Sequence, residues 1–176
     1  MYYYYILVDG KYQLFISKNQ DNILGGFVEI MYNWSNFVER LSELLTIANI
    51  KPTQLAKNLG VKSATITRYL SGIRKPRLEM LFKIADYFHC SIDFLLGRSD
   101  TGEHFDPLPL PDFKERFSFL LDFYKKSRYR LVKDTHIDES IIYDWQNGKF
   151  SPGIESLIVM ADYFECSIEF ILGREN

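Results

Sequence analysis

The chain has 176 residues, of which 47% are hydrophobic and 25% charged, and its formal net charge is −2. This composition is typical of soluble globular proteins and excludes a fibrous or intrinsically disordered chain. No stretch approaches the roughly 20 apolar residues that a membrane span needs, so we expect a cytoplasmic protein with no membrane partner.

Residues 1–34 are expected to form an N-terminal β-hairpin extension. The β-prone runs 2–8 and 11–17 flank Asp9-Gly10, a pair that suits the positive φ angles of a tight type I′ turn. Residues 27–32 are a candidate third strand, and the tyrosines at 2–5 require packing on the first helical module or on a second chain. Because Met31 lies just before the helical part, whether residues 1–30 belong to the native protein is left open.

Residues 37–98 are repeated without a gap at 113–174. The sequence CSIDFLLGR at 90–98, for example, becomes CSIEFILGR at 166–174. A repeat of this kind indicates a duplicated module. We therefore expect a mainly α fold with a first five-helix domain at 35–98, a Pro-rich acidic linker at 99–112 and a second, more acidic domain at 113–176.

Apolar spacing and helix-end signals place five helices in each copy. In the first copy we expect Pro52 to open the second helix, Gly60 to stop it, and Ser63 and Ser91 to cap the third and fifth helices. In the second copy Asp138 or Glu139 opens the third helix. The expected helices of the first copy are about 37–48, 52–59, 64–70, 78–88 and 92–96.

Cys90 and Cys166 fall at equivalent places, and we interpret both as small apolar fillers of separate cores that do not bridge. No further Cys or His stands at metal-ligand spacing, so no metal or other cofactor is expected. Trp145 takes the place of Tyr69 and is interpreted as a packing residue. No phosphate-binding Gly loop or nucleophile set indicates an enzyme.

The charge is distributed unevenly between the copies. Residues 37–98 carry 10 basic and 5 acidic side chains, whereas residues 113–174 carry 9 and 10. A polyanion should therefore be attracted to the first copy.

Residues 54–76 read QLAKNLGVKSATITRYLSGIRKP: a short helix, a Gly turn and a second helix with a polar face. This pattern, together with the terminal SIDFLLGR, resembles the Cro/phage-repressor helix-turn-helix family, also called the Xre family. The resemblance covers both copies and implies lambda-repressor-like domains whose third helix enters the major groove of DNA. It implies a DNA-binding transcriptional regulator, of which phage repressors are examples, and not an enzyme.

The resemblance also implies which residues contact DNA. Arg68 is suited to pair with O6 and N7 of a guanine, and Ala64 to touch a thymine methyl group. The usual Gln of the family is replaced by Pro52, so one phosphate contact is missing. Base-reading positions are Ser63, Ala64, Thr67 and Arg68, and backbone-contacting positions are Lys51, Gln54, Lys62, Thr65, Ser71, Arg74, Lys75 and Arg77.

The second copy is expected to be a weaker reader of DNA or a dimerisation body. Its carboxylates should repel phosphate, although they can accept a hydrogen bond from cytosine N4. The partners expected are double-stranded DNA and either a second copy in a homodimer or the sister module in an intramolecular pseudo-dimer, with Phe94 and Phe170 candidates for that contact. The alternative is a protein-binding inhibitor or antitoxin-like module. The possible second site comprises Glu139, Ser140, Tyr143, Asp144 and Lys149.

Overall fold

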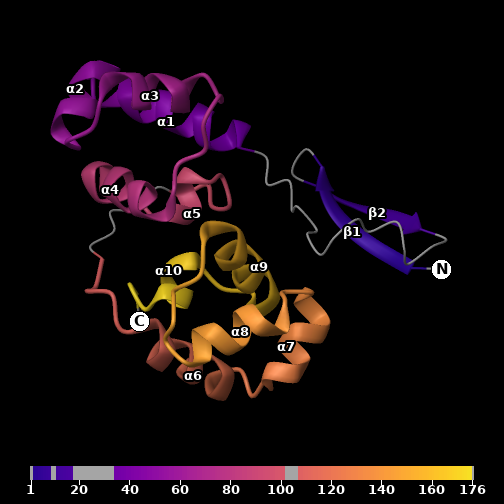
Figure 1. Ribbon diagram of the computed structural model, residues 1–176. Helices are drawn as coiled ribbons and strands as arrows, with labels where there is room; N and C mark the ends of the chain where they lie inside the picture. Colours follow the sequence, from indigo (N-terminus) through magenta and orange to yellow (C-terminus); the bar gives the residue numbers. More distant parts are fainter. Residues whose placement is uncertain (1, 9–10, 18–33, 102–106, 176) are drawn as a thin grey trace.

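The computed structural model describes residues 2–8, 11–17, 34–101 and 107–175, and for the stretches before residue 34 it describes the backbone alone. The protein is mainly helical, as predicted (Figure 1). We call α1–α5 the first module and α6–α10 the second module. The first module contains α1 (Ser35–Ile47), α2 (Pro52–Asn58), α3 (Ser63–Leu70), α4 (Leu78–Phe88) and α5 (Ile92–Leu95). The second module contains α6 (Phe113–Phe123), α7 (Arg128–Thr135), α8 (Glu139–Gln146), α9 (Ile154–Phe164) and α10 (Ile168–Leu172).

Two strands precede the helices. β1 (Tyr2–Val8) pairs antiparallel with β2 (Lys11–Ser17), with Tyr2 opposite Ser17 and Val8 opposite Lys11. The Asp9-Gly10 turn, the packing of the tyrosine side chains and the candidate strand at 27–32 lie outside the described residues.

Three helices, α2, α5 and α10, start at the residues that signal a helix start in the sequence. Pro52 occupies the first turn of α2, where its missing N–H costs no intrahelical hydrogen bond. The Ser91 hydroxyl accepts from the Phe94 N–H at 3.0 Å, and the Ser167 hydroxyl accepts from the Phe170 N–H at 2.9 Å. These caps start the short α5 and α10, so the prediction for Ser91 is confirmed.

The prediction for Ser63 is wrong. Lys62, in an extended conformation, precedes α3, and Ser63 is already the first helical residue. Because an N-cap residue must lie outside the helical conformation, the Ser63 hydroxyl cannot act as the cap. Ser63 is exposed at the N-terminal end of α3.

The buried side chains form one hydrophobic cluster that runs through both modules. It is continuous because α5 contacts α10, with Ile92 and Ile168 fully buried. The expectation of separate cores is therefore wrong. Cys90 and Cys166 are nevertheless free thiols, and burial raises the pKa of Cys90 to about 12, as expected for a space-filling residue.

The equivalent residues Tyr69 and Trp145 are both buried, in agreement with a packing role. The end of the linker lies against the second module, because the Leu108 N–H donates to the Arg174 carbonyl oxygen at 2.8 Å. None of the helices in the described part of the chain is long and apolar enough to cross a bilayer.

Candidate nucleic-acid interface

α2 and α3 form a helix-turn-helix unit. Ala56 is buried, which allows close approach, and the Val61 N–H donates to the Ala56 carbonyl oxygen at 2.9 Å. Gly60 has a φ of +69°, a conformation that side chains disfavour, and it turns the chain between the helices. The turn holds α3 against α2 and leaves one face of α3 toward solvent.

The two faces of α3 differ in chemistry. Ile66 and Tyr69 are buried in the core with exposed fractions of 0% and 4%. Thr65 is half-buried, and the Thr67 hydroxyl donates to the Ser63 carbonyl oxygen at 3.2 Å. The outer face of α3 carries the four side chains predicted to read bases, all of them exposed: Ser63, Ala64, Thr67 and Arg68.

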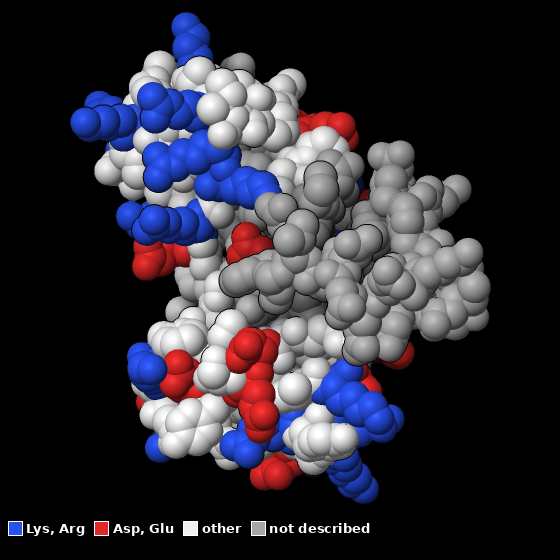
Figure 2. Space-filling model, turned by 45° about the vertical axis from the view of Figure 1, so that its right-hand side comes forward, with Lys and Arg blue, Asp and Glu red and all other residues white. Residues whose placement is uncertain are grey.

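Cations surround this outer face. In Figure 2 they gather on one edge of the upper body, which is the first module. Within the described residues, no ion pair joins any of the six to a carboxylate. The six exposed cations are Lys51, Lys62, Arg68, Arg74, Lys75 and Arg77, and we call them the cationic rim. Unpaired exposed cations are suited to phosphate contact.

Two further residues predicted to contact the DNA backbone are also exposed. Gln54 is exposed in α2, and the exposed Ser71 donates its hydroxyl hydrogen to the Arg68 carbonyl oxygen at 3.2 Å. Burial raises the pKa of Tyr69, and the nearby positive charges of Arg74 and Arg77 partly oppose that shift. Two cations of the rim therefore lie close enough to α3 for their charge to act on its buried Tyr69.

Comparisons with known proteins agree with this geometry. Residues 41–95 match the family model described as helix-turn-helix. The first module is a helix-turn-helix domain of the Cro/phage-repressor (Xre) type. That match spans α1 from Leu41 to the end of α5, so it includes the whole α2–α3 unit.

Curated relatives of this Xre-type domain are named as regulators. The chain is 41% identical over 61 residues to the HTH-type transcriptional regulator AnsR of Bacillus subtilis, and 38% identical over 66 residues to the cryptic phage CTXphi transcriptional repressor RstR of Vibrio cholerae. These matches cover 35% and 38% of this chain, and the chain spans 53% and 59% of those relatives.

A solved structure is similar to a larger part of the chain. It is the crystal structure of a transcriptional regulator from Listeria innocua, 28% identical, with 66% of this chain and 96% of that chain covered. The TM-score is 0.34.

The second module has different chemistry at the same places. An offset of 76 residues relates α3 to α8 and the six cations to six other residues, none of which is basic. Arg68 becomes Asp144, whose carboxylate is 3.1 Å from Nζ of Lys149. The six counterparts of the cationic rim are Ser127, Asp138, Asp144, Phe150, Ser151 and Gly153.

Asp138 has the structural role that Ser63 lacks. Its carboxylate accepts from the Ser140 N–H at 2.7 Å and is the N-cap of α8. Hydrogen bonds from the Ser140 hydroxyl and N–H lower the pKa of Asp138, so the group is charged at neutral pH. Glu139, Ser140 and Tyr143 of the possible second site are exposed, whereas Asp144 is half-buried.

Of three exposed aromatic side chains on the second module, Tyr143 was among the predicted site residues, whereas Tyr129 and Phe150 were missed. Tyr129 is 72% exposed, Tyr143 56% and Phe150 45%, and they replace Thr53, Thr67 and Arg74 of the first module. Aligning the two copies at the 76-residue offset would have shown each replacement.

In the described part of the chain, no group of three or more His, Cys, Asp or Glu side chains could hold a metal ion.

Proposed function

We infer that the chain is a sequence-specific double-stranded DNA-binding transcriptional regulator, in which the first module is the main reader. The observation that carries this proposal is the outer face of α3, with Arg68 exposed among five further cations that have no carboxylate partner in the described residues. The Xre-type match of residues 41–95 supports it, because such proteins place this helix in the major groove.

The residues divide into two roles in this proposal. Arg68 contacts a guanine in the major groove and, with Ser63, Ala64 and Thr67, determines which sequence is preferred. The other rim cations, with Gln54, Thr65 and Ser71, contact phosphates and fix the register of the module on the duplex. The chain is therefore a binding protein and not an enzyme.

The second module serves as a weaker reader or as a pairing body in this proposal. Asp138 and Glu139 face the place where phosphates would lie if α8 were docked as α3 is, and like charges repel there. The only cation of the loop after α8, Lys149, is already paired with Asp144.

Random-site selection on the intact protein tests the main role. We expect Arg68→Ala to lose preference at one base pair, by roughly 1 to 3 kcal/mol of discrimination, while the rest of the motif is retained. Lys133→Ala is the matched control, because Lys133 is an exposed cation on α7 of the second module. An unchanged motif in Arg68→Ala would remove Arg68 from base reading.

A second candidate function is a protein-binding inhibitor or antitoxin-like module, favoured by the exposed Tyr129, Tyr143 and Phe150 beside the acidic start of α8. Exposed aromatic groups of this kind are enriched in protein interfaces. A Tyr143→Thr and Phe150→Arg variant distinguishes the two functions. If it loses regulation in cells while the purified protein selects the same DNA with the same affinity, the second module acts through a protein.

A further inference from the structure

The two modules are joined by hydrogen bonds that occur in equivalent pairs. The Ile168 N–H at the start of α10 donates to Oδ2 of Asp93 at 2.7 Å, and the Ile92 N–H at the start of α5 donates to Oε1 of Glu169. Asp93 and Glu169 are equivalent residues of the repeat, as are Ile92 and Ile168. Each helix therefore receives a carboxyl oxygen from its sister at its positive N-terminal end.

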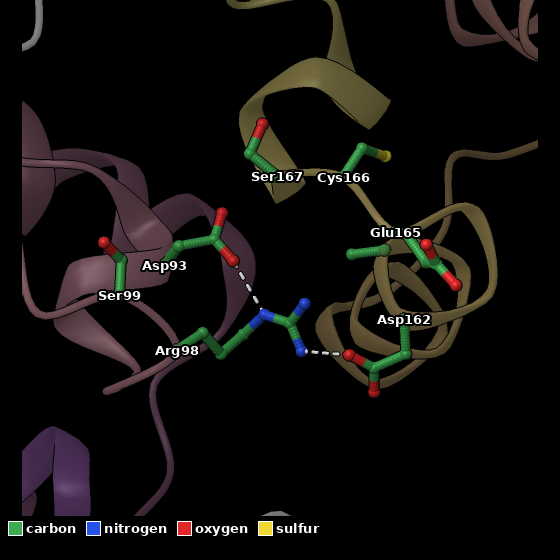
Figure 3. Close-up of a pocket in the computed structure, with 8 residues that line it drawn as sticks. Asp93, Arg98, Ser99, Asp162, Glu165, Cys166 and Ser167 are labelled. Carbon is green, nitrogen blue, oxygen red and sulfur yellow. Dashed lines mark hydrogen bonds and ion pairs between the residues drawn. The ribbon is translucent and has the colours of Figure 1, made fainter.

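Ion pairs repeat the same exchange. Nη1 of Arg98 is 2.6 Å from Oδ1 of Asp162, and the equivalent Arg174 pairs with the equivalent Asp86 (Figure 3 shows the first pair). Nε of Arg98 also holds Oδ1 of Asp93 at 2.7 Å, which orients that carboxylate toward the sister helix. Contacts in which two partners exchange roles are the mark of a two-fold, isologous interface.

This interface is closed within one chain. Asp93 is 7% exposed and Glu169 0%, and Ile92 and Ile168 are fully buried between the modules. The surface of α5 that could join a second copy is thus already occupied by α10. One chain presents α3 and α8 in the two equivalent positions of a pseudo-dimer, with different side chains on each.

We propose that one chain recognises a non-palindromic duplex, with a single sequence-specific half-site under α3 and no base preference under α8. This inference rests on the proposed DNA-binding function and specifies its substrate. A symmetric pair of readers selects an inverted repeat. Here the two supporting modules are symmetric but the reading helices are not, since Arg68 and Arg74 correspond to Asp144 and Phe150 in the repeat.

Two measurements on the wild-type protein test the proposal. Random-site selection should return one half-site without an inverted copy, and the mass of the purified complex should fit one 20.8-kDa chain per duplex. A palindromic motif, or two chains on each selected duplex, overturns the proposal while leaving DNA binding in place. If no duplex binds even at low salt, the proposed function itself fails, and the inference about the duplex fails with it.

A transplant makes the test sharper. The variant Tyr143→Thr, Asp144→Arg, Phe150→Arg gives α8 and its following loop the first module's residues at three exposed or half-buried positions. It should acquire an inverted repeat with half-sites about 10 base pairs apart and bind it roughly tenfold or more tightly than wild type does. Adding Arg68→Asp should return the variant to a single half-site, now read by α8.

Two outcomes, one from the transplant and one from wild type, contradict the proposal. One is a motif that stays a single half-site although the variant melts at the wild-type temperature, because the modules would then not be placed as equivalent readers. The other is an inverted repeat already selected by wild type. Because the wild-type selection needs no substitution, misfolding of the variant would still leave the proposal open to refutation.

Discussion

The outer faces of α3 and α8 have the same helix length and the same place in the repeat, yet one is cationic and the other is acidic and aromatic. The six exposed cations of the cationic rim lie on or near the first face, whereas the second has no counterpart of any of them and its Lys149 is paired with Asp144. The buried residues beneath differ far less: Ile66 corresponds to Ile142, and Tyr69 to Trp145. The comparison teaches that the core preserves the scaffold while the surface decides what the scaffold binds.

The largest expected effect is on stability and concerns the buried face of α8, which should depend on packing as the buried face of α3 does. Trp145 is fully buried and its ring lies edge-on to Phe113 and Phe117 at 6.0 and 5.9 Å. We expect Trp145→Ala to lower the free energy of unfolding by about 3 to 5 kcal/mol, measured by urea denaturation. Trp145→Tyr, which installs the first module's residue, should cost clearly less; equal losses would contradict a packing role.

The next largest expected effect is on DNA binding and tests the difference in charge between the two modules. Arg74→Phe with Lys75→Ser gives the first module the residues Phe150 and Ser151 of its sister. Two lost phosphate contacts should make the slope of log K against log salt shallower by about 1.8 and weaken binding to all sequences alike. The control replaces two exposed lysines of the second module, Lys126→Ser with Lys133→Ser. Equal slopes in both variants would contradict the assignment of the cationic rim.

A third prediction uses a difference at the interface, where one module supplies Asp93 and the other Glu169. Burial and the hydrogen bond to Asp93 raise the pKa of Glu169 to about 8. The folded protein then binds more protons than the unfolded chain between about pH 4.5 and 8, so stability should fall as the pH rises through that window.

Glu169→Gln isolates this contribution, because an amide keeps an acceptor for the Ile92 N–H and a donor for Asp93 but cannot titrate. We expect the variant to lose the downward slope and to be more stable than wild type at pH 8 by on the order of 2 kcal/mol. Urea denaturation from pH 5 to 8 measures this. The control is Asp122→Asn, at an exposed carboxylate of α6, which should keep the wild-type slope of stability against pH. The same slope in Glu169→Gln would contradict the prediction.

The smallest expected effect comes from the ion pair between Lys149 and Asp144, which reduces the positive charge that the second module offers to DNA. Asp144→Ala removes the partner of Lys149, and a pair this exposed contributes about 1 kcal/mol or less to stability. DNA affinity should rise by roughly two- to fivefold, since one repulsive carboxylate is lost and one cation is released. Electrophoretic mobility shifts at low and high salt measure it; weaker binding would show that Asp144 itself contacts DNA.

Local features could be predicted from the sequence because they depend on nearby residues. The helix at Leu78–Phe88, the Ser91 cap and the first-turn position of Pro52 are confirmed. Exposure of Arg68 and burial of Trp145 follow from helical spacing alone. The Xre-type match of the first module confirms the resemblance there.

Features that depend on how the modules meet could not be predicted. The exchange of Asp93 and Glu169 between helix starts joins residues 75 and 77 positions apart in the chain, and no local pattern indicates it. The prediction of a Ser63 cap was wrong because the extended Lys62 is the residue before α3 and Ser63 is already helical. Phe94 and Phe170, predicted at the module contact, lie beneath the guanidinium groups of Arg40 and Arg116 of their own modules.

The central claim is that α3 is the main reader of bases and α8 is not, although the scaffold presents both. Backbone amide chemical shifts of the intact protein, recorded with and without a duplex recovered by selection, test it most directly. We predict large changes across 62–77 and only small ones across 138–153. Changes of equal size in both segments, or changes confined to the second, would contradict the account.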